Sequence, residues 1–93
     1  MSCLIGYDLN REGANYSAKN TALRNHIKER YPKYWAHLDS TFTVVTDLTA
    51  ELIRHDLLPF VDENDELLVV ELTHEGAWHG FSEKGRNWLL KDL

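Results

Sequence analysis

The spacing of apolar residues changes character several times within a chain of only 93 residues. Residues 3–9, 34–46 and 66–72 are rich in β-branched and aromatic side chains or form short apolar runs, as strands do. Between them, residues 17–31 and 48–61 repeat apolar side chains every three or four positions, which is the spacing of an amphipathic helix. This alternation predicts a single domain, residues 1–93, that mixes two helices with a sheet.

Local signals set the expected ends of these elements. Pro32 ends the first helix, because proline disfavours helical geometry in the residue before it. A turn at residues 39–40 could split residues 34–46 into a hairpin. Thr49 or Asp47 could supply the oxygen that caps the second helix.

The order of the elements predicts an α+β ferredoxin-like sandwich (βαββαβ), with two helices packed on one face of an antiparallel sheet. In that topology residues 3–9 and 66–72 lie side by side at the centre. The continuous apolar run LLVVEL, residues 67–72, is typical of a central strand covered on its faces. A short C-terminal helix is expected near residues 82–92, with Ser82 as its cap.

Charge and composition narrow the functional classes. The net charge of −5 argues against broad, unspecific binding of nucleic acid, which usually requires a basic surface. Cys3 is the single cysteine, so no internal disulfide can form, which fits a reducing cytosol, and a buried strand position is expected for it. No apolar run approaches the roughly 20 residues of a membrane span, and no signal-peptide pattern opens the chain. We therefore expect a cytoplasmic protein with no membrane association.

Asp8 raises the main functional question, because it is a carboxylate at the end of an apolar first strand. It could hold a hard cation such as Mg²⁺, which would orient water and neutralise charge on a phosphate. It could instead accept backbone hydrogen bonds in the loop that follows. The residues by themselves leave both interpretations open.

Asp39, Ser40 and His37 form a second group of candidates. Asp39 could be a second carboxylate near Asp8, Ser40 could approach a phosphate, and His37 could act as a general base. The alternatives are that Asp39 and Ser40 only form a turn and that His37 has a surface or packing role.

Cations and aromatic residues offer possible contacts to nucleic acid. Arg11 follows Asp8 closely, and Lys28 belongs to a basic face of the first helix that could contact phosphates. Some aromatic residues could stack on bases, or could instead belong to a dimer interface or to the core: Tyr34, Trp35, Trp78 and Phe81.

Four pieces of the sequence occur in an order that resembles a known group. They are YDL (residues 7–9), LDSTF (38–42), ELLVVEL (66–72) and GFSEKGRNWL (80–89). With them the chain resembles the SinR-like small proteins, which are similar in turn to VapD and to the small CRISPR-associated dimeric nuclease of spacer acquisition. The resemblance implies a ferredoxin-like fold and a homodimer, and it implies that Asp8 is the metal-binding and catalytic residue.

Two classes of function follow from these observations. The first is a dimeric, non-catalytic binding or accessory module of a defence or mobile-element system, with a protein or nucleic acid as partner. The alternative is a Mg²⁺-dependent endonuclease or endoribonuclease that uses Asp8 from each protomer, including a toxin-like ribonuclease of the VapD kind. Pairing of the protomers is expected through sheet edges or through the C-terminal segment.

Overall fold

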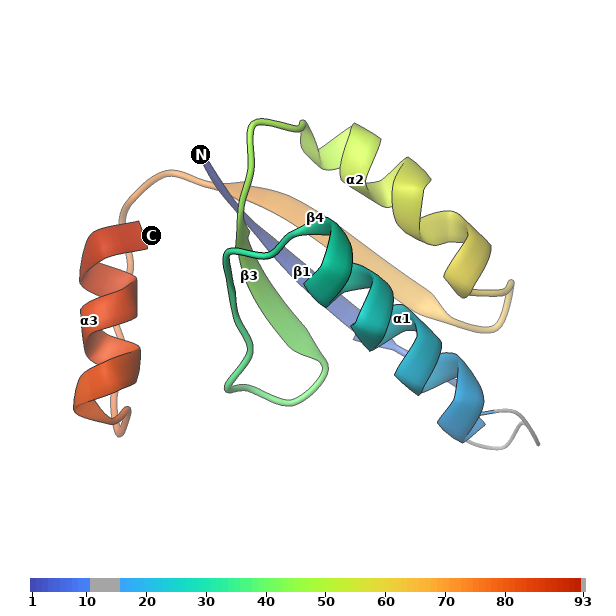
Figure 1. Ribbon diagram of the computed structural model, residues 1–93, viewed down its shortest axis with the longest axis horizontal. Helices are drawn as coiled ribbons and strands as arrows, with labels where there is room; N and C mark the ends of the chain where they lie inside the picture. Colours follow the sequence, from blue (N-terminus) through green and yellow to red (C-terminus); the bar gives the residue numbers. More distant parts are fainter. Residues whose placement is uncertain (11–15, 93) are drawn as a thin grey trace.

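The computed structural model describes residues 1–10 and 16–92, and Figure 1 shows two helices lying over one face of a sheet and a third helix set apart. The elements follow the expected βαββαβ order and are extended by a C-terminal helix. In chain order they are β1 (Ser2–Asp8), α1 (Tyr16–Arg30), β2 (Tyr34–Trp35), β3 (Thr41–Val45), α2 (Ala50–Leu57), the 3₁₀ turn η1 (Leu58–Phe60), β4 (Glu66–Leu72) and α3 (Glu83–Asp92).

The four strands lie in the order β2-β3-β1-β4, and every neighbouring pair is antiparallel. This is the ferredoxin-like fold that the sequence predicts. β1 and β4 pair along their whole length, as expected.

The prediction that β4 is a central strand covered on its faces is wrong. β4 is an edge strand, and burial alternates along it. Leu67 and Val69 face the helices and are half-buried, whereas Leu68 and Val70 are exposed on the other face. The unbroken apolar run therefore places apolar side chains on both faces of β4, but other elements cover only one of these faces at Leu67–Val70.

The hydrophobic core lies between the sheet and the first two helices. Cys3 and Ile5 of β1 are fully buried, and they belong to one cluster with Leu23 of α1 and Leu57 of α2. Cys3 is thus the buried free thiol that the sequence predicts, and burial raises the pKa of its thiol, so that the neutral form is favoured.

The helix boundaries follow the local signals closely. α1 begins and ends one residue earlier than expected. The Oγ1 atom of Thr49 accepts a hydrogen bond from the amide of Leu52 at 3.2 Å, so Thr49 is the N-cap of α2. Ser40 occupies a left-handed backbone conformation (φ 52°) in the turn that separates β2 from β3, as the hairpin prediction requires.

α3 is attached to the rest of the molecule at both of its ends. The Oγ atom of Ser82 accepts a weak hydrogen bond from the amide of Gly85 at 3.4 Å, which confirms the expected cap. Gly85 is buried, and a Cβ atom at this position would lie 3.1 Å from Cζ2 of Trp35 in β2. At the other end of α3, Asp92 pairs with Lys33 at 2.9 Å and its carbonyl accepts from the Ser2 hydroxyl.

Candidate functional site on the open face of the sheet

The face of the sheet opposite α1 and α2 carries the even-numbered residues of β1 and β4, because side chains alternate along a strand. In the β1–β4 register, Leu4 lies opposite Val70 and Gly6 lies opposite Leu68. Leu68 is 58% exposed and Val70 is 37% exposed. Together these residues form an apolar stripe that we call the open-face stripe.

Asp8 lies at one end of the open-face stripe. It is the last residue of β1, and its register partner in β4 is Glu66. Both side chains are exposed, and they line one shallow hollow with Gly6 and Leu68. Two carboxylates of adjacent strands therefore share a row on the same face. No motif in the sequence marks Glu66 as a partner of Asp8.

The two interpretations of Asp8 remain predictions. No hydrogen bond to its carboxylate is found within residues 1–10 and 16–92. The alternative in which Asp8 caps its own loop depends on residues 11–15, and these lie outside the described residues, as does Arg11.

The structure gathers His37, Asp39 and Ser40, but not with Asp8. All three come from the β2–β3 connection, and they line a polar cavity of about 380 Å³ with Arg24 of α1. Asp8 does not line this cavity. Lys28 lies one turn further along α1, where it is exposed and also outside this cavity.

The ring of His37 also belongs to an aromatic cluster. It stacks on Trp35 with centroids 5.8 Å apart, and it meets Phe81 edge-on at 5.5 Å. Trp35 stacks in turn on Trp88 of α3 at 6.0 Å. The contact between Trp35 and Trp88 attaches α3 to β2. Because the His37 ring contacts Trp35 and Phe81, it takes part in the packing of this cluster.

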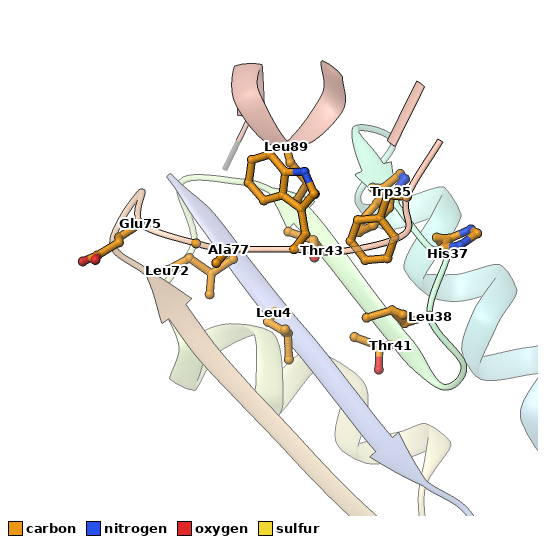
Figure 2. Close-up of a pocket in the computed structure, with 13 residues that line it drawn as sticks. Leu4, Trp35, His37, Leu38, Thr41, Thr43, Leu72, Glu75, Ala77 and Leu89 are labelled. Atoms are coloured by element: carbon orange, nitrogen blue, oxygen red, sulfur yellow. The ribbon is translucent and has the colours of Figure 1, made fainter. Parts of the chain in front are cut away.

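An apolar cavity of about 250 Å³ lies between the sheet and the segment 73–82 (Figure 2). Leu4, Thr43 and Leu72 line it from the sheet, and Leu89 of α3 lines it from the other side. Trp35, Trp78 and Phe81, which the sequence singles out as aromatic residues of two loop regions, line this one cavity. Tyr34 points elsewhere and contacts Phe42 at a centroid distance of 5.8 Å.

Lys19, another cation of α1, is held in a structural contact. Its Nζ atom lies 2.6 Å from a carboxylate oxygen of Asp65 and 2.6 Å from one of Asp62. The Asp65 side chain is fully buried and also accepts from the backbone amides of Asn10 (2.8 Å) and Asp62 (2.9 Å). Burial opposes ionisation, but these donors outweigh it and lower the pKa of Asp65 to about 2.

Within residues 1–10 and 16–92, no group of three or more His, Cys, Asp or Glu side chains is placed to hold a metal ion. In the same residues, no helix combines the length and the apolar character needed to cross a bilayer.

Among solved structures, Cas2 of Streptococcus pyogenes, known from a crystal structure at pH 6.5, is similar to this chain. The TM-score is 0.60 and the sequence identity is 22%, and the match covers 78% of this chain and 87% of that chain. No family model and no curated protein matches the sequence. The likeness to Cas2 shows a shared fold. This fold agrees with the resemblance to the small CRISPR-associated nuclease, whereas the resemblances to the SinR-like proteins and to VapD remain predictions.

Proposed function

We propose that the protein is a dimeric, non-catalytic binding module that serves a defence or mobile-element system. The observation that carries this proposal is the open-face stripe. Leu68 and Val70 present apolar side chains to solvent on a face that no other element of the described chain covers at that position. Removing apolar surface of this kind from water is the dominant favourable term in most protein–protein association.

A second copy of the chain is the occupant that fits this stripe. A twofold axis through the sheet would place the stripe of one protomer on the stripe of its partner, so no other surface needs to be complementary. The resemblance to a dimeric CRISPR-associated nuclease implies a homodimer as well, and the fold shared with Cas2 agrees with that resemblance. The remaining surface, with a net charge of −5 on the chain, would then be free to recruit a partner protein.

Charge repulsion gives this dimer an expected orientation. Asp8 and Glu66 form an acidic row at one end of the stripe. An axis that keeps the two acidic rows apart avoids repulsion between four carboxylates across the interface. In a non-catalytic dimer we therefore expect the two Asp8 side chains to lie far from each other.

The same acidic row supports the alternative function, a Mg²⁺-dependent nuclease. Asp8 and Glu66 are exposed oxygen donors on neighbouring strands, which is the donor type that Mg²⁺ prefers. A bound Mg²⁺ would supply an activated water and neutralise charge on a phosphate. This function needs a dimer in which the acidic rows converge, and His37 would lie in a different cavity.

Cleavage assays separate the two functions. Wild-type protein, Asp8→Asn, Glu66→Gln and the control Glu63→Gln are incubated with single-stranded RNA, single-stranded DNA and duplex DNA, in Mg²⁺ and in EDTA. Glu63 is an exposed carboxylate in the turn before β4, and it does not line the hollow that Asp8 and Glu66 share. The proposal predicts no Mg²⁺-dependent cleavage by any of the four proteins. Cleavage that Asp8→Asn abolishes and Glu63→Gln retains would replace the binding module by the nuclease.

A further inference from the structure

The polar cavity beside α1 has the features of a ligand site, and no residue of the open-face stripe lines it. Its chemically active lining consists of Tyr7, Asn20, Arg24, His37, Asp39 and Ser40. A volume of about 380 Å³ falls within the range of small-molecule sites, about 300–1,000 Å³.

Arg24 is fixed in position before any ligand arrives. Its Nη1 atom donates to the hydroxyl oxygen of Tyr7 at 3.1 Å, and its guanidinium carbon lies 4.9 Å from the centre of the Phe42 ring. The Tyr7 hydroxyl occupies one of the five N–H donors of the guanidinium, so donors remain for an anion. A preorganised guanidinium recognises phosphate through paired hydrogen bonds.

The lining also carries groups that suit a sugar. The Asp39 carboxylate is an acceptor for vicinal hydroxyls, as in the recognition of ribose by acidic residues in nucleotide-binding proteins. Ser40 and Asn20 add polar groups beside it, and Tyr16 adds an aromatic ring on which a base can stack.

Tyr7 connects Arg24 to the turn that carries Asp39 and Ser40. Its hydroxyl accepts from Arg24, and its amide donates to the carbonyl of Ser40 at 3.1 Å. The turn with Asp39 and the guanidinium on α1 are therefore both anchored to the same residue of β1, which is itself 8% exposed.

The geometry points to a ribonucleoside monophosphate as the ligand of this cavity. The phosphate contacts Arg24, the ribose hydroxyls donate to Asp39, and the base stacks on Tyr16. Inorganic phosphate would contact Arg24 but would make no ribose contact to Asp39 and no stacking contact to Tyr16, so the nucleotide is favoured over the bare anion.

The test is a titration of the ¹⁵N-labelled protein, followed by amide chemical shifts, with AMP, dAMP, adenosine and inorganic phosphate as probes. We expect AMP to shift the amides of residues 37–40 and of α1 near Arg24. Binding of dAMP should be roughly 10-fold weaker, because one hydroxyl donor to the carboxylate is lost. Adenosine and phosphate should each bind at least 10-fold more weakly than AMP.

Three variants localise the site. Arg24→Gln should weaken AMP binding at least 10-fold, whereas Lys28→Gln, a cation one turn away on α1 and outside the cavity, should leave it unchanged. Asp39→Asn, in an exposed turn, should remove the preference for AMP over dAMP, and it decides the matter if Arg24→Gln does not fold.

Three results would each overturn the inference. They are an absence of shifts around the cavity with AMP, equal losses in Arg24→Gln and Lys28→Gln, and binding of inorganic phosphate as tight as that of AMP. The outcome does not depend on whether the protein dimerises or cleaves nucleic acid.

Discussion

Replacing Leu68 by Ala tests the proposed dimer most directly. Full burial of a leucine side chain stabilises a complex by about 2 kcal/mol relative to exposure. Leu68 is 58% exposed in the single chain, so pairing through the open face would recover about 1 kcal/mol from each copy. A twofold interface contains this side chain twice, and Leu68→Ala should weaken the dimer by about 2 kcal/mol, or roughly 30-fold in Kd.

Sedimentation equilibrium over a dilution series measures this change. Leu52→Ala is the matched control, because Leu52 is 53% exposed but lies on α2, which covers the other face of the sheet. The control should alter Kd by less than about 2-fold, since surface substitutions away from an interface have small effects. A wild-type protein that stays monomeric, or equal losses in the two variants, would refute the reasoning.

The remaining predictions concern the fold that positions these sites. Asp65→Asn should lower the free energy of unfolding at pH 7 by about 2 kcal/mol, because it weakens the contact to Lys19 and two amide bonds; urea titration checks this. The depressed pKa of Asp65, about 2, contributes stability that is fully present above the ordinary value near 4 and is lost as pH falls towards 2. Melting curves of wild-type protein should show this loss, and those of Asp65→Asn should show a smaller one. Gly85→Val should destabilise the protein by about 1–3 kcal/mol, because the added carbon atoms press on Trp35; unchanged thermal melting would contradict this. Thr49→Ala should cost about 1 kcal/mol by removing the cap of α2, and Thr49→Ser should restore most of it in the same melting experiment.

The elements of the fold could be predicted from local patterns because each depends on a few neighbouring residues. The three-to-four-residue spacing placed α1 within one residue of its ends, and Thr49 capped α2 as one of two expected candidates. The predicted turn at residues 39–40 lies between the two strands of the hairpin, and Ser82 caps the last helix. Period, capping and turn chemistry act over a few residues, so a single sequence carries them.

The candidate sites required the tertiary structure. The sequence nominated Asp8, His37 and Asp39 together, yet Asp8 lines a hollow on the open face while the other two line a cavity beside α1. Asp8 instead shares a row with Glu66 of β4, because the antiparallel register of β1 and β4 places these two residues opposite each other. They are 58 positions apart in the sequence.

The sequence by itself determined the element order, the burial of Cys3 and the caps, because these follow from periodicity and local chemistry. The tertiary structure decided that β4 is an edge strand and which face of the sheet is left open. It also decided which carboxylate and which guanidinium lie beside which partners. Strand order and face are set by the packing of distant segments against one another, and no local pattern of residues encodes which distant side chain will be the neighbour.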